Sequence, residues 1–135
     1  MAASSDILTA DDIRTLVDRF YDKVNGDELL GPIFNDVAKV DWGHHLPVMY
    51  QFWESLLLGA KSYQGAPFPK HMVLPVEQQH FERWFSLFVM TVNENFQGSK
   101  AEEAKGRALC IADTFAQRMG VLRDPSAISR ILFAA

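Results

Sequence analysis

The 135-residue sequence has one cysteine, no long apolar run and no cluster of basic side chains. The single cysteine excludes a disulfide within the chain, and the first residues show neither the basic region nor the apolar core of a secretory signal. No run approaches the ~20 apolar residues that cross a bilayer. A net charge of −4 repels phosphate backbones and anionic lipids. We therefore expect a cytoplasmic protein that binds neither membranes nor nucleic acid.

The sequence also has little of the alternation between apolar and polar residues that is typical of strands, and it lacks the common catalytic motifs. The sequence contains no G-x-S-x-G, no phosphate-binding loop and no G-x-G-x-x-G, and its histidines and cysteine match no closed zinc site. What it does contain is 48% apolar residues, enough for a folded core, with ten Phe, three Trp and three Tyr. So many aromatic side chains either fill a core or line a flat ligand.

Apolar residues recur at helical spacing in four long segments, and this predicts an all-α domain. The segments cover about residues 10–25, 41–58, 75–96 and 99–119, and a short helix is expected after residue 124. No linker interrupts them, so we expect one domain over 1–135, with 1–8 and 124–135 as peripheral tails. Packing these helices leaves no strong extra apolar face, which favours a monomer.

Several helix ends can be predicted from single residues. Thr9 has the hydroxyl of an N-cap, and Pro75 suits the first turn of a helix. Ser99 and Glu102 have the spacing of a capping box. Pro47 falls inside the second predicted helix, where a proline removes one backbone hydrogen bond.

Histidines are the most informative polar residues. On a helical wheel His45 heads the apolar stripe that contains Met49 and Phe52, whereas His44 and His80 fall on flanks, at the surface or boundary. Taken alone, His45 is an ordinary buried histidine that bonds a backbone carbonyl. By the same reasoning, His71, in a segment without periodicity, is a loop histidine in solvent.

The interpretation changes when these residues are considered together. The apolar stripes of three predicted helices carry, in order, Phe20 with Tyr21, His45 with Met49, and Trp84. His71 precedes the last of these helices. Such a set suits a metal cofactor held on one side by an imidazole, with hydrogen-bond donors over its open side.

Two alternatives of other classes remain. Glu77-x-x-His80 and Asp41-x-x-His44 have the spacing found in di-iron carboxylate helical bundles. Both histidines, however, fall off the apolar faces of their helices. The other alternative is a helical interaction domain without a cofactor.

Many short runs resemble the group III truncated haemoglobins, in the same order and at fitting spacing. They span about residues 10–119. The runs are FYDKV at 20–24, LGPIF at 30–34, WGHHLPVMxxFW at 42–53, LLG at 57–59, YxGxPFxKHxxLP at 63–75 and HFxRWxxLF at 80–88.

The resemblance implies a shortened globin, a two-over-two helical sandwich around haem b. It makes His71 the ligand of a pentacoordinate iron, and it excludes His80 from that role. It also places Tyr21, His45 and Trp84 on the distal side. The apolar wall it implies consists of Phe20, Met49 and Phe52.

The activity implied by the resemblance is reversible binding of oxygen, and of nitric oxide and carbon monoxide, at the haem iron. It also permits nitric oxide dioxygenase or peroxidase-like chemistry. Because the sequence has no flavin or nicotinamide motif, such turnover needs electrons from an external reductase. Arg83 and Lys70 are either partners of the haem propionates or solvated charges.

Overall fold

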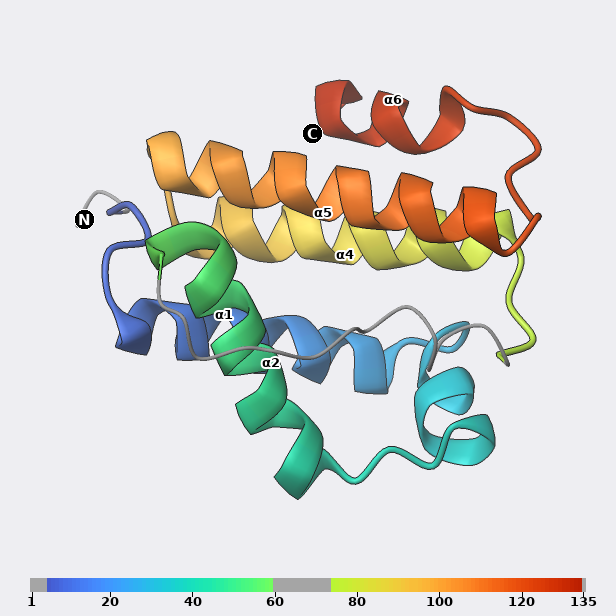
Figure 1. Cartoon of the computed structure of the whole chain (residues 1–135), viewed down its shortest axis with the longest axis horizontal. Coiled ribbons are helices and arrows are strands. Elements are labelled where there is room, and N and C mark those ends of the chain that lie inside the picture. The colour runs from blue at the N-terminus through green and yellow to red at the C-terminus, as the bar shows by residue number, and fades with distance from the viewer. Residues whose placement is uncertain (1–4, 60–73, 135) are drawn as a thin grey trace.

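The computed structural model describes residues 5–59 and 74–134, and every regular element in these ranges is helical (Figure 1). The all-α prediction is therefore confirmed, together with the short helix after residue 124. Within these ranges, no helix combines the length and apolar character needed to cross a bilayer. The elements are α1 (Ala10–Gly26), the π-helical turn η1 (Ile33–Val37), α2 (Trp42–Leu58), α4 (Gln78–Asn95), α5 (Ser99–Arg118) and α6 (Ala127–Ala134).

The helices form two packed layers. Helix α1 packs on α2, α4 packs on α5, and contacts of α1 with α4 and of α2 with α5 join the two layers (Figure 1). Helix α6 covers α4 and α5 from outside. The largest fully buried side chains are aromatic: Phe20, Phe85 and Phe88 are each at most 1% exposed. Full burial of one such side chain contributes about 1.5–3 kcal/mol.

Residues from both ends of the chain take part in this core. Ile7, ahead of α1, and Ile128, in α6, are each 0% exposed and belong to the same apolar cluster as the long helices. The expected domain bounds, with 1–8 and 124–135 as tails, stay a prediction.

Two predicted helix starts can be compared directly with the structure. Thr9 caps α1 as predicted: its hydroxyl accepts a hydrogen bond from the N–H of Asp12 at 3.2 Å, and the Asp12 carboxylate accepts one from the N–H of Thr9 at 3.1 Å. The prediction for Pro75 is wrong, because α4 begins only at Gln78. Glu77 is extended and forms a reciprocal capping box with His80, which fixes the start of α4.

Helix α5 is capped from far away in the sequence. The carboxylate of Asp6 accepts hydrogen bonds from the N–H groups of Lys100 at 2.9 Å and Ala101 at 2.8 Å. The predicted Ser99 capping box is therefore wrong: Ser99 is the first residue of the helix, and its hydroxyl donates to Asp6. Gly98, at φ 142, permits this approach, since a Cβ there would lie 2.5 Å from Asp6 Cγ.

The turn after α1 is equally tight, and it shapes one wall of the site. The side chain of Asp27 accepts hydrogen bonds from the N–H groups of Leu29 at 3.1 Å and Leu30 at 2.9 Å. A Cβ on Gly31 would lie 2.9 Å from the carbonyl oxygen of Asn25, so only glycine fits against the end of α1. The turn directs Leu30, and Ile33 and Phe34 of η1, toward the pocket.

Candidate functional site

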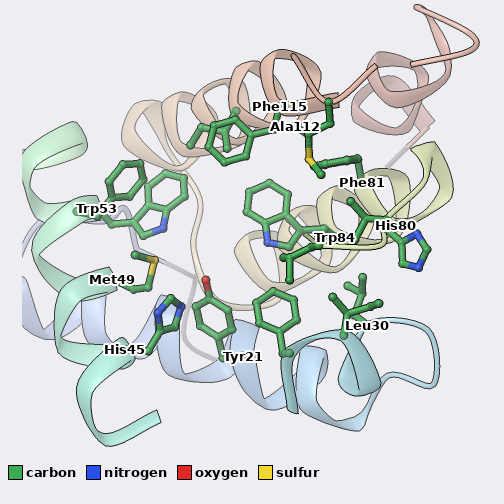
Figure 2. A pocket seen from close by; sticks show the side chains of 17 residues that line it. Tyr21, Leu30, His45, Met49, Trp53, His80, Phe81, Trp84, Ala112 and Phe115 are labelled. Carbon is green, nitrogen blue, oxygen red and sulfur yellow. The ribbon is translucent and has the colours of Figure 1, made fainter. Parts of the chain in front are cut away.

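A pocket between the two helical layers is the candidate site. Seventeen of the described residues line it, and they come from α1, the following turn and η1, α2, the segment before α4, α4 and α5 (Figure 2). The space within it is about 880 Å³, including the part that is open to solvent. Most of the lining is aliphatic or aromatic.

Tyr21 supplies a phenol from α1. The residue is 6% exposed, and Figure 2 shows its hydroxyl directed toward the space between Met49 and Trp84. Burial raises the pKa of the phenol above its usual value. Tyr21 therefore keeps its proton at all ordinary pH values and remains a hydrogen-bond donor.

Helix α2 contributes His45, Met49 and Phe52, three half-buried residues that line the pocket on successive turns. Pro47 lies within this helix, which continues through it to Leu58. The imidazole of His45 meets the Tyr21 ring edge to face, with ring centroids 5.6 Å apart and an interplanar angle of 78°. Its Nε2 atom is buried.

Trp84 is the third side chain with a polar group in the pocket, and it comes from the other helical layer. It lines the pocket from α4, and its indole nitrogen faces the same space as the Tyr21 hydroxyl (Figure 2). Phe20 is not among the described residues that line the pocket. It lies behind the wall, with its ring centroid 4.9 Å from that of Tyr21 and 5.5 Å from that of Trp84, and it supports both.

Of the two histidines near the start of α4, only His80 lies among the described residues. His71, the predicted iron ligand, lies outside the described residues; Leu74 and Val76, which follow it, line the pocket. His80 is half-buried at the pocket boundary, in agreement with its predicted position. Its Nδ1 accepts a hydrogen bond from the N–H of Glu77 at 2.9 Å, so the proton of the neutral ring is on Nε2.

The part of the chain that the structure describes contains no ligand cluster of the kind that the di-iron alternative requires. Over residues 5–59 and 74–134, no three His, Cys, Asp or Glu side chains gather as they would around a metal ion. Glu77 and His80 are joined in the helix cap instead, and His44 is exposed.

Arg83, expected either to pair with a haem propionate or to be a solvated charge, forms an ion pair with Asp27. Its Nη1 donates to the Asp27 carboxylate at 2.5 Å. Burial opposes the charged form of Asp27, but hydrogen bonds from Leu30, Arg83 and Leu29 outweigh it and lower the pKa of this carboxyl. Arg83 thus ties the turn after α1 to α4. Lys70 lies outside the described residues.

One wall of the pocket was absent from the sequence prediction. Ile111, Ala112 and Phe115 line it from the second half of α5, together with Met119, the residue that follows this helix. A signal was present: alanines at every fourth position, ending in Ala112 and Ala116, form the buried face of α5, and larger apolar residues run beside them. The other lining residues outside the predicted set are Leu30, Ile33, Phe34, Trp53, Leu74, Val76, His80 and Phe81.

Comparisons with known proteins agree with this geometry. A sequence profile described as bacterial-like globin matches residues 6–119. A group 3 truncated haemoglobin of Campylobacter jejuni is 35% identical over 112 residues, which cover 80% of this chain and 88% of the relative. The crystal structure of a group III truncated haemoglobin from Campylobacter jejuni superposes with a TM-score of 0.78 at 33% identity, covering 87% of this chain and 95% of that one.

Proposed function

Because this chain belongs to the bacterial-like globins, as a group III truncated haemoglobin with the two-over-two fold, we propose that it reversibly binds oxygen at haem b in the described pocket. Nitric oxide and carbon monoxide are further ligands in this proposal. The observation that carries it is the convergence of Tyr21, His45 and Trp84 in a pocket that is otherwise almost entirely apolar.

The described residues fit a haem. A porphyrin is flat and largely apolar, and aromatic and aliphatic side chains from both helical layers face the pocket as such a group requires (Figure 2). Met49 and Phe52 from α2, with Phe115 from α5, would hold its faces and edges. When bound, haem supplies an iron that can accept a diatomic ligand at an open coordination position.

His71 is the residue we propose to hold the iron. The proposal rests on the run Lys70-His71 followed by Leu74-Pro75, which resembles the family pattern at this point. A neutral imidazole bonded on one side leaves the other side for the ligand, and in our proposal this is the side of Tyr21, His45 and Trp84.

The polar tips on that side stabilise a ligand that accepts hydrogen bonds. The Tyr21 hydroxyl stays protonated because burial raises its pKa, and the indole N–H of Trp84 can only donate. Oxygen would accept such hydrogen bonds more strongly than carbon monoxide. Donors in an apolar pocket therefore favour slow oxygen release.

The same pocket supports redox chemistry only with a source of electrons. Nitric oxide oxidation or peroxidase-like turnover in our proposal uses a separate reductase, because the sequence has no G-x-G-x-x-G motif for a flavin or nicotinamide electron carrier. We also propose a cytoplasmic monomer, from the single cysteine and the absence of a large apolar run in the sequence.

An absorption spectrum tests the proposal. Protein purified after growth with added haem precursor should show an intense band at the blue edge of the visible spectrum, and that band should shift when the reduced protein meets carbon monoxide. A di-iron enzyme would show two irons per chain without a porphyrin spectrum, and a cofactor-free domain would show no visible colour. Either of these spectra would overturn the proposal.

A further inference from the structure

A second aromatic group lies beside the pocket, and the proposed function does not account for it. Trp42, the first residue of α2, is one helical turn ahead of His45 and is not among the described pocket-lining residues. Its ring centroid is 5.2 Å from that of Tyr21 and 5.5 Å from that of His45. Trp42 therefore contacts two of the three polar side chains of the pocket from behind.

The indole of Trp42 is held at its other end by a chain of hydrogen bonds. Its Nε1–H donates to Asn35 Oδ1 at 2.8 Å. The amide nitrogen of Asn35 in turn donates to Asn25 Oδ1 at 2.9 Å and to the carbonyl oxygen of Gly31 at 3.0 Å. These bonds connect the start of α2 with η1, the end of α1 and the turn between them.

Stacking holds the same ring in its plane. Phe34, also in η1, lies nearly parallel to Trp42 with an interplanar angle of 24° and ring centroids 6.0 Å apart. Phe34 itself meets Tyr21 edge to face at 6.0 Å. Trp42 is thus restrained by one hydrogen bond and one stacked ring.

His45 meets two neighbouring rings at the same angle. Its imidazole stands at 78° to both Tyr21 and Trp42. The three ring centroids form a nearly equilateral triangle, 5.6 Å between His45 and Tyr21, 5.5 Å between His45 and Trp42, and 5.2 Å between Tyr21 and Trp42. Trp42 therefore contacts the imidazole beside its contact with Tyr21 and restricts how readily His45 turns.

We propose that Trp42, anchored by Asn35, is a positioning residue that holds the His45 ring against Tyr21 and so limits the rate at which small ligands enter and leave the pocket. The inference rests on the proposed function, because it concerns access to the same site. Asn35 is exposed and outside the pocket lining, so its substitution acts on ligand entry only indirectly, through Trp42 or through the turn that its amide bonds at Asn25 and Gly31.

Three substitutions test the proposal on the haem-loaded protein. Trp42→Phe keeps a ring and removes the N–H, Asn35→Ala removes the acceptor and keeps the tryptophan, and Trp42→Leu removes both contacts. The rate of carbon monoxide binding after a light flash should rise about 2-fold to 10-fold in each, the factor expected from losing one aromatic contact. Trp42→Leu should have the largest effect.

Nuclear magnetic resonance of the diamagnetic carbon monoxide complex gives a readout that is independent of rate. In the parent protein, the ring protons of His45 should show Overhauser contacts with both Tyr21 and Trp42. In Asn35→Ala the contact between His45 and Tyr21 should weaken although neither residue has changed. Retention of that contact at full strength, together with the parent rate, would overturn the proposal.

Tyr50→Phe is the matched control. Tyr50 is another aromatic residue of α2, and its hydroxyl donates to Asp18 of α1 on the outside of the molecule. The control therefore also removes a hydrogen bond between α2 and a neighbouring element, but away from His45. An equal rate increase in Tyr50→Phe would mean general loosening and would overturn the specific role of Trp42.

The outcomes separate this inference from the proposed function. A parent protein that binds no carbon monoxide contradicts the function and the inference with it. A parent that binds carbon monoxide normally, with variants that have unchanged rates and contacts, contradicts only the inference. If Trp42→Leu does not fold, Trp42→Phe and Asn35→Ala decide, because both leave the buried core intact.

Discussion

Arg83 and Asp27 form an ion pair in which the carboxylate is 9% exposed and the guanidinium is 42% exposed. The pair joins α4, one residue before Trp84, to the turn that places Leu30 in the pocket wall. Two opposite walls of the site are therefore held by one charged contact, and its charge state bears on the shape of the pocket.

The first prediction concerns the pH dependence of this contact. The pKa of Asp27 is lowered in the folded protein, so its stabilising effect is complete above the unfolded-state value, about 3.9, and is lost as the pH falls through the folded-state value. Asp27→Asn should lower the free energy of unfolding by about 1 kcal/mol at pH 7, since Arg83 is partly screened by solvent. In urea titrations this difference should shrink as the solution approaches pH 3; a constant difference would contradict the ion pair as its cause.

The second prediction separates the two histidines near the start of α4. His71→Ala should abolish stable haem binding, whereas His80→Ala should retain haem and lose about 1 kcal/mol of stability with the cap on Glu77. The haem absorption that remains with the protein after gel filtration measures the first effect, and thermal unfolding measures the second. Equal haem retention in both variants would remove His71 from the proposed role.

The third prediction concerns oxygen release. Tyr21→Phe and Trp84→Phe each remove one donor that faces the pocket, and each should speed oxygen dissociation roughly 2-fold to 10-fold, as expected for one neutral hydrogen bond. Stopped-flow mixing of the oxygenated protein with excess carbon monoxide measures the rate. Tyr50→Phe, a phenol outside the described pocket lining, should release oxygen at the parent rate. Rates in the two pocket variants that match this control would remove both donors from the proposed role.

The fourth prediction concerns stability without the cofactor. A ligand that binds only the folded state stabilises it by about 1.4 kcal/mol for each tenfold excess over its dissociation constant. Haem-free protein should therefore unfold at a clearly lower temperature than the haem-bound form in the same buffer. Adding haem back should restore the transition in the parent and leave that of His71→Ala unchanged. Identical transitions with and without haem would show that the pocket residues form a complete core by themselves.

Most of the fold could be predicted from local pattern, and the two wrongly predicted helix starts have different physical origins. Thr9 caps its own helix three residues on, so its role is visible in the sequence. The start of α5 depends on Asp6, more than 90 positions earlier, and no local pattern reveals that carboxylate. Pro75 misled the prediction for α4 because a proline permits a helix start without requiring one, and the cap between Glu77 and His80 determines it.

The residues of the site also divide into those that the sequence predicts and those that it does not. Tyr21, His45, Met49, Phe52 and Trp84 could be predicted from apolar stripes and family resemblance, and the structure places all five around one pocket. Phe20 has the same pattern but lies one layer deeper, because periodicity gives the face of a helix and not the distance to a cavity. The sequence did not predict the pocket wall around Phe115 of α5, because no polar residue in that wall indicates a binding site.

The bond between Asp6 and the first turn of α5 has a consequence for folding order. The amides of Lys100 and Ala101 are capped only when segments more than 90 residues apart have come together, so we expect this turn to form late in folding. Hydrogen exchange at these two amides then reports the docking of the N-terminal segment. A chain shortened to begin at Ile7 would still contain all the long helices, yet α5 would fray from its first turn.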